Sequence, residues 1–109
     1  MIYAGAYTQG EVPAPVVYTF TDSTGAPLNL TGYTRASFRY KQRGGTAVDR
    51  TAVITGAAAG QVTYTWVQAD LNTFGGYTAV FSVDNGANLF TSDTIAYYVQ
   101  PTVGTPPTL

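Results

Sequence analysis

The sequence contains no cysteine and no histidine. Without cysteine there can be no disulfide bond and no thiolate catalysis. Without histidine the chain lacks the usual general base near neutral pH and the commonest metal ligand. Charged residues are also scarce, at 10% of the chain, and the formal net charge is −1, unlike the basic composition of a nucleic-acid-binding protein. We therefore predict a protein that is not an enzyme, with no catalytic residues, no metal ligands, no cofactor and no nucleic-acid partner.

Long apolar segments are missing as well. No apolar run approaches the roughly 20 residues of a membrane-spanning helix. The first residues, Met1 to Gly5, lack the basic region and apolar stretch of a secretory signal peptide. We expect a protein made in the cytoplasm that has no contact with a membrane.

The abundant residues are those of strands and turns. The chain has nine tyrosines, five phenylalanines, one tryptophan and 12 glycines among its 109 residues, and threonine and valine are frequent. This composition is typical of β-structure, and the length suits one domain with a single core.

Apolar and polar residues alternate along several short segments, as strands with one buried face require. The expected strands are residues 16–21, 28–30, 35–43, 48–55, 61–67, 77–83, 88–91 and 94–100. About seven short strands with turn signals every eight to twelve residues predict an all-β, immunoglobulin-like β-sandwich. We place the sandwich at residues 15–100. We expect an N-terminal arm, residues 1–14, in which glycine and proline prevent regular structure, and an extended tail, residues 101–109.

The inward faces of these strands define a candidate core made largely of aromatic residues. Tyr77 follows a glycine-rich bend, where a tyrosine of immunoglobulin domains bonds to nearby backbone two positions before a cysteine. Ala79 stands at that cysteine position, so aromatic packing must replace the disulfide. The predicted core residues are Tyr18, Phe20, Phe38, Tyr64, Trp66, Tyr77 and Phe81.

All five basic residues lie between Arg35 and Arg50. Four of them share one face of the strand predicted at 35–43, while Phe38 and Tyr40 face inward. This face has two interpretations: a solvated surface with edge-protecting charges, or an electrostatic contact with an acidic neighbouring subunit. The six acidic residues are scattered singly, mostly at turns, and suggest no metal site.

The tyrosines are too numerous for so small a core. Tyr33, one of Tyr97 and Tyr98, and the two tyrosines of the N-terminal arm cannot all be buried, and exposed tyrosines suit protein or carbohydrate interfaces. The candidate partner interface therefore comprises Arg35, Arg39, Lys41, Arg43, Tyr3 and Tyr7.

Three segments, taken in order, resemble the N-terminal domain family of phage baseplate upper proteins. The first, residues 18–32, is a strand and turn followed by Leu28-Asn29-Leu30-Thr31-Gly32. The second runs from Gly60 to Trp66 and is followed by Asp70-Leu71, and the third is residues 76–83. The resemblance covers about residues 16–100.

The resemblance implies an immunoglobulin-like module of a phage virion, made in the host cytoplasm, whose partners are other virion proteins in a multi-copy symmetric assembly. A tail or baseplate adaptor follows from the family, and a capsid decoration protein from the short chain. A carbohydrate-binding adhesion domain remains the alternative.

Overall fold

Eight strands and two short 3₁₀ helices make up the computed structural model, which describes the backbone of residues 2–105 and the side chains of residues 5–105. The strands are β1 Ile2–Thr8, β2 Val16–Thr19, β3 Arg35–Gln42, β4 Val48–Gly56, β5 Gln61–Tyr64, β6 Gly75–Asp84, β7 Leu89–Thr91 and β8 Ile95–Gln100, and the helices are η1 Ala57–Ala59 and η2 Gln68–Leu71. The all-β prediction is confirmed. No helix among these residues is long and apolar enough to span a lipid bilayer.

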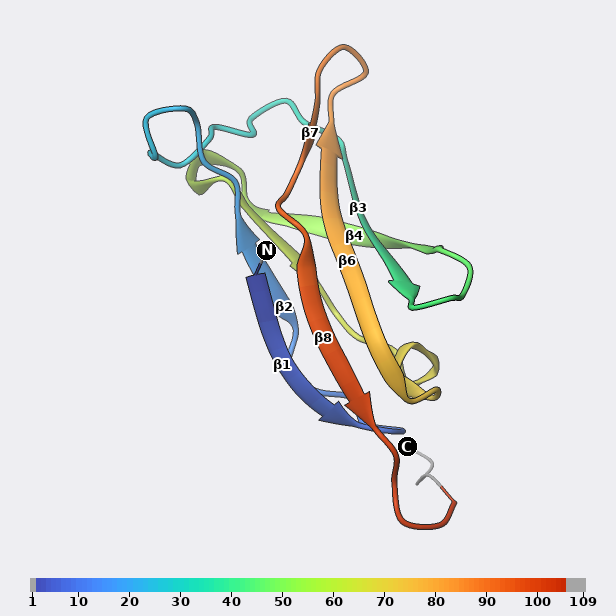
Figure 1. The fold of residues 1–109 in the computed structure, drawn as a ribbon. Coiled ribbons are helices and arrows are strands. Elements are labelled where there is room, and N and C mark those ends of the chain that lie inside the picture. The colour runs from blue at the N-terminus through green and yellow to red at the C-terminus, as the bar shows by residue number, and fades with distance from the viewer. Residues whose placement is uncertain (1, 106–109) are drawn as a thin grey trace.

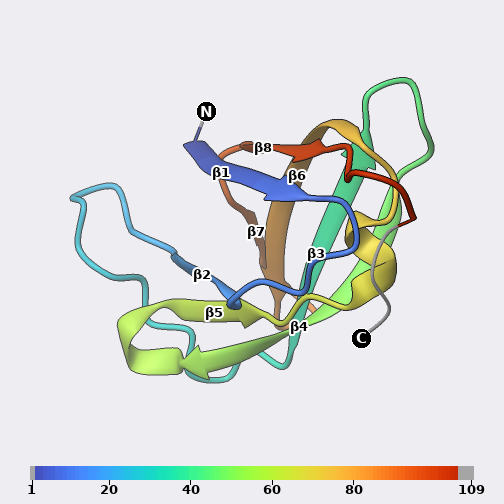
Figure 2. The ribbon, with the colours of Figure 1, turned by 90° about the horizontal axis from the view of Figure 1, so that it is seen from below.

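The strands form one curled sheet in the order β1-β8-β6-β3-β4-β5-β2, and β7 pairs with β6 (Figure 1). The turn of the sheet falls within β4. Residues Val48 to Ala52 of β4 pair with β3, whereas the part from Val53 onward pairs with β5. Figure 2 shows the result: β2 and β5 lie on one side of the molecule, and β1 and β8 lie on the other. The core fills the space between these two layers.

The N-terminal segment differs from its prediction. The expectation that glycine and proline prevent regular structure there is wrong for Ile2–Thr8, which pairs in parallel with β8. Gly5, at φ +124°, is accommodated at a register shift in this pairing, because a glycine inside a strand commonly marks a bulge. Pro13 and Pro15 come after the strand has ended.

Residues 28–30 do not form the expected strand. Leu30 is fully buried in a loop, and an isolated bridge between Thr21 and Pro27 is the local strand-like pairing. In the predicted tail, residues 101–105 have no regular structure, and residues 106–109 lie outside the described part of the chain.

Aromatic rings fill the core. Phe38 stacks on Tyr64 with ring centroids 4.4 Å apart, and it lies 4.9 Å from Phe81 and 5.6 Å from Trp66. Each such ring contributes on the order of 2–3 kcal/mol by burial, so this cluster stabilises the two layers without a disulfide. Of the predicted core residues, Phe20, Phe38, Tyr64, Trp66, Tyr77 and Phe81 are buried, and Tyr18 is half-buried against them.

Tyr77 makes the backbone contact expected of its corner position. Its hydroxyl donates a hydrogen bond to the carbonyl oxygen of Thr73, at 2.5 Å. Ala79, at the position of the missing cysteine, is 3% exposed. The bend before β6 is therefore fixed to the strand that follows it.

Asp70, in η2, is a buried carboxylate that joins three strands. Its Oδ1 accepts hydrogen bonds from the Tyr40 hydroxyl of β3, at 2.9 Å, and from Nε of Arg50 of β4, at 3.0 Å. Its Oδ2 accepts hydrogen bonds from the Tyr64 hydroxyl of β5 and from the backbone N–H of Val67, the latter at 3.1 Å. Burial and the bond to Asp70 raise the pKa of both tyrosines. The sequence alone did not predict this cluster.

Candidate docking face

The basic strand β3 lies inside the sheet, between β4 and β6. Its charges therefore do not protect a sheet edge. Phe38 and Tyr40 of β3 are buried, and the alternate residues Arg39 and Lys41 are exposed on the outer surface. We call the outer surface of β4, β3, β6 and β8 the outer face.

Two ion pairs neutralise one half of the outer face. Arg39 lies opposite Asp49 of β4 and binds both carboxylate oxygens, with Nε–Oδ1 at 2.6 Å and Nη2–Oδ2 at 3.0 Å. Arg35 lies opposite Asp84 of β6, with Nη2–Oδ1 at 2.8 Å. Each arginine lowers the pKa of its carboxylate by hydrogen bonding.

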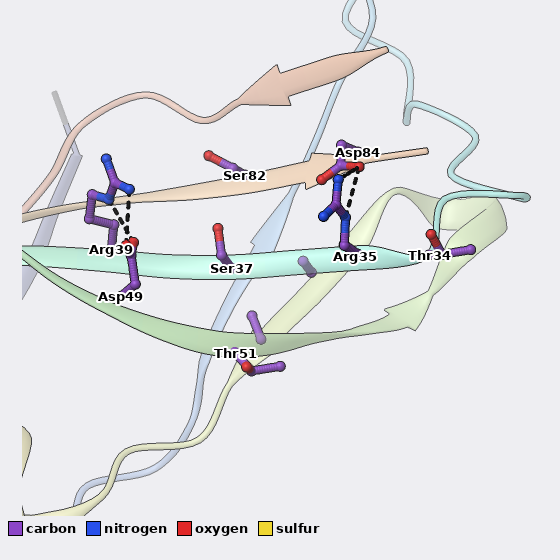
Figure 3. Close-up of a pocket in the computed structure, with 10 residues that line it drawn as sticks. Thr34, Arg35, Ser37, Arg39, Asp49, Thr51, Ser82 and Asp84 are labelled. Carbon is purple, nitrogen blue, oxygen red and sulfur yellow. Dashed lines mark hydrogen bonds and ion pairs between the residues drawn. The ribbon is translucent and has the colours of Figure 1, made fainter. Parts of the chain in front are cut away.

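A polar hollow of about 480 Å³ lies between these two ion pairs (Figure 3). Ser37, Thr51 and Ser82 lie between them, on neighbouring strands. Because each arginine is paired with its own carboxylate, the charges of the two ion pairs cancel on this half of the outer face.

A second hollow, of about 410 Å³, occupies the other half of the outer face. Its floor is made of small residues. Thr78 of β6 lies in the middle, opposite Lys41 of β3 on one side and Ala96 of β8 on the other. Gly76 extends the floor, and its carbonyl accepts a hydrogen bond from the backbone of Arg43, at 2.9 Å. The lining residues are Lys41, Gln42, Arg43, Gly44, Gly76, Tyr77, Thr78, Ala96 and Tyr97. We call this the Lys41–Arg43 hollow.

The Lys41–Arg43 hollow carries unbalanced positive charge. Within the part of the chain that the structure describes, the ion pairs are Arg35–Asp84, Arg39–Asp49 and Arg50–Asp70. Lys41 and Arg43 are exposed and belong to none of them. The structure thus divides the predicted basic face into a neutralised half and a cationic half.

The tyrosines of the candidate interface lie elsewhere. The ring of Tyr7 lies 5.6 Å from that of Trp66 and 6.0 Å from that of Tyr97, so Tyr7 packs against the core. The side chain of Tyr3 lies outside the described residues. The expectation that these tyrosines cannot all be buried is confirmed, because Tyr98 is 43% exposed, whereas Tyr97 is buried. Tyr98 lies opposite Gly76, beside the Lys41–Arg43 hollow.

The acidic residues form no recognisable metal site. Among the described side chains, no three acidic, histidine or cysteine groups gather where they could hold an ion. Asp84 to Asn88 instead forms the tight connection from β6 to β7, with Gly86 at φ +88°.

Comparisons with known proteins agree with this reading of the fold. The family model of the BppU N-terminal domain matches residues 19–105. The solved N-terminal domain of ORF48 from phage TP901-1 is similar in structure, with a TM-score of 0.67, 21% identity, and coverage of 87% of this chain and 82% of that one.

A second similar structure is CopC from Methylosinus trichosporium OB3b, with a TM-score of 0.56, 15% identity, and coverage of 92% of this chain and 86% of that one. At these identities, the two structures support the fold alone. No curated protein matches the chain. By its match to the family model, the chain belongs to the BppU N-terminal domain family of phage baseplate upper proteins and is a structural component of a phage virion.

Proposed function

We propose that this chain is a docking module that attaches to neighbouring virion proteins through its outer face and performs no catalysis. The observation that carries the proposal is that Lys41 and Arg43, beside a hollow of small residues, have no acidic partner among the described side chains. A surface of this kind is completed by a partner with complementary charge. The rigid aromatic core holds the outer face in one shape, so docking requires little reorganisation.

The proposed partners are other virion proteins in a multi-copy symmetric assembly. Membership of the baseplate family supports a place at the tail or baseplate, and a capsid decoration role is the second placement. Synthesis in the host cytoplasm before assembly belongs to the same proposal.

The copy number per particle tests the placement. Quantitative mass spectrometry of purified heads and purified tails, with a major capsid and a major tail protein as internal standards, gives this number. A small number of copies confined to tail tips supports the adaptor role, and hundreds of copies on heads support decoration. Absence of the chain from both fractions would refute the docking proposal itself.

No observation favours the carbohydrate-binding alternative. That function would require a cleft lined by exposed tyrosines. Tyr98 is the one tyrosine exposed among the described side chains, and it lines neither hollow of the outer face.

A further inference from the structure

We propose that the Lys41–Arg43 hollow receives an acidic segment of the neighbouring virion protein. A carboxylate of that segment lies between the two cations, and its neighbouring residues lie on the floor of Gly76, Thr78 and Ala96. This inference rests on the proposed docking function and names the chemistry of its partner.

The two ends of strand β3 differ in how freely their cations can bind a partner carboxylate. Arg35 and Arg39 already bind Asp84 and Asp49 at 2.6–3.1 Å. A partner carboxylate at that end would have to compete with them. Lys41 and Arg43 have no such competitor among the described residues. An incoming carboxylate therefore gains charge-assisted hydrogen bonds there without breaking any ion pair.

The floor of the Lys41–Arg43 hollow is formed by small residues and leaves room for a partner. A Cβ atom built on Gly76 would meet nothing within 4 Å, so the backbone of β6 is accessible from the outer face at this point. Thr78 and Ala96 are short, and the hollow of about 410 Å³ leaves room for a side chain together with a stretch of main chain. Tyr98 is exposed on β8 opposite Gly76, next to the hollow, and arginine and tyrosine are residue types enriched in protein interfaces.

An acidic protein segment suits this surface better than a nucleic acid does. Binding to a phosphate backbone generally uses many cationic contacts, about 6–10 in strongly salt-dependent cases. Two cations that have no acidic partner among the described residues, in a chain with a formal net charge of −1, provide far fewer. Phe38 and Tyr40 alternate with the basic residues but are buried, so they offer no stacking surface for bases.

The first test removes the two charges. Phages are assembled with the variant Lys41→Gln/Arg43→Gln supplied in place of the natural chain, and copies per particle are counted. The matched control is Ser23→Glu/Thr31→Glu, at two exposed loop positions. Removing two positive charges and adding two negative ones both change the net charge from −1 to −3. Urea denaturation confirms beforehand that both variants are folded.

We expect incorporation of Lys41→Gln/Arg43→Gln to fall tenfold or more, and that of the control to remain at the wild-type level. Equal incorporation of wild type and Lys41→Gln/Arg43→Gln would overturn the inference and leave the docking function intact. Failure of the wild-type chain itself to enter particles would refute the docking function instead.

A second test identifies the partner directly. A photo-reactive amino acid at position 78, on the exposed floor of the hollow, is cross-linked in intact particles, and the product is sequenced by mass spectrometry. We expect a virion-protein peptide with an aspartate or glutamate close to the cross-link. Reversing that acidic residue to lysine should restore incorporation of Lys41→Glu/Arg43→Glu. Cross-linking to DNA, or to a segment without acidic residues, would overturn the inference.

Discussion

Replacing Asp70 with asparagine removes the charge from the buried cluster while keeping the shape of the side chain. Each carboxylate oxygen accepts two hydrogen bonds, one of them from a nitrogen that can only donate: Arg50 Nε at Oδ1 and the Val67 N–H at Oδ2. An asparagine has one oxygen and one NH₂ group. Whichever way the amide is turned, its NH₂ group faces one of these two N–H donors.

The magnitude follows from the bonds that cannot be remade. About two hydrogen bonds to a charged acceptor are lost or weakened, at roughly 1.5–3 kcal/mol each. The lost attraction to Arg50 adds less than a fully buried pair would, because the Arg50 side chain is 36% exposed. We expect Asp70→Asn to lower the free energy of unfolding by about 3–5 kcal/mol, a large share of the roughly 5–15 kcal/mol of a typical domain.

Urea denaturation followed by the fluorescence of Trp66 measures this loss. Trp66 is the only tryptophan and is 2% exposed, so it reports on the core. With a slope of about 1–2 kcal/mol/M, the midpoint should fall by about 1.5–5 M. The control is Asp49→Asn, which removes the same charge from the exposed pair with Arg39 and should leave the midpoint almost unchanged. Equal midpoints for the two variants would refute the role assigned to the Asp70 cluster.

Two further predictions concern alkaline pH and a glycine. Burial, followed by hydrogen bonding to Asp70, raises the pKa of Tyr64, and burial raises that of Tyr97. Since tyrosine in the unfolded chain has a pKa of about 10, the stability linked to these groups is complete below about pH 10 and is lost as the pH rises through the folded-state values. Urea midpoints should accordingly fall above about pH 10, and a flat profile up to about pH 12 would contradict the burial of these hydroxyls. Gly60→Ala would place a Cβ atom 2.5 Å from the carbonyl oxygen of Phe20 at φ +69°, whereas Gly25→Ala at φ +85° meets nothing within 4 Å. Thermal melts should show a far larger loss for Gly60→Ala than the roughly 1–2 kcal/mol of backbone strain expected for Gly25→Ala, and equal losses would contradict the close approach at Gly60.

Local patterns were sufficient to predict most strands and the core. The alternation of Phe38 and Tyr40 with Arg39 and Lys41 depends on the two-residue period of a strand, which is visible in a few residues. The Arg39–Asp49 pair also had a signal that the sequence analysis did not use. The two residues stand five positions on either side of Gly44, in the turn that sets the register of this hairpin.

The rest depends on how the sheet curls. Asp70 meets Tyr40, Arg50 and Tyr64 from positions 30, 20 and 6 residues away, and no local pattern brings these side chains together. Arg35 and Asp84 are 49 residues apart. Without a local signal for Asp84, the sequence could not separate Arg35 from Lys41 and Arg43.

The N-terminal strand was missed for a related reason. Its partner β8 lies at the other end of the sequence. Parallel strands are not joined by a hairpin turn, so no turn signal in the sequence could predict the pairing. Gly5 also interrupts the alternation at the register shift.

The parallel pairing of β1 with β8 has a mechanical consequence. Because both strands run in the same direction, the chain enters at one end of the pair and leaves at the other (Figure 1). A pull between these ends acts along the two strand axes in opposite directions and loads the evenly spaced hydrogen bonds of the ladder in shear, all together. Opening them one after another, as in a zipper, would need far less force. We therefore expect this domain to transmit tension along its length with little extension.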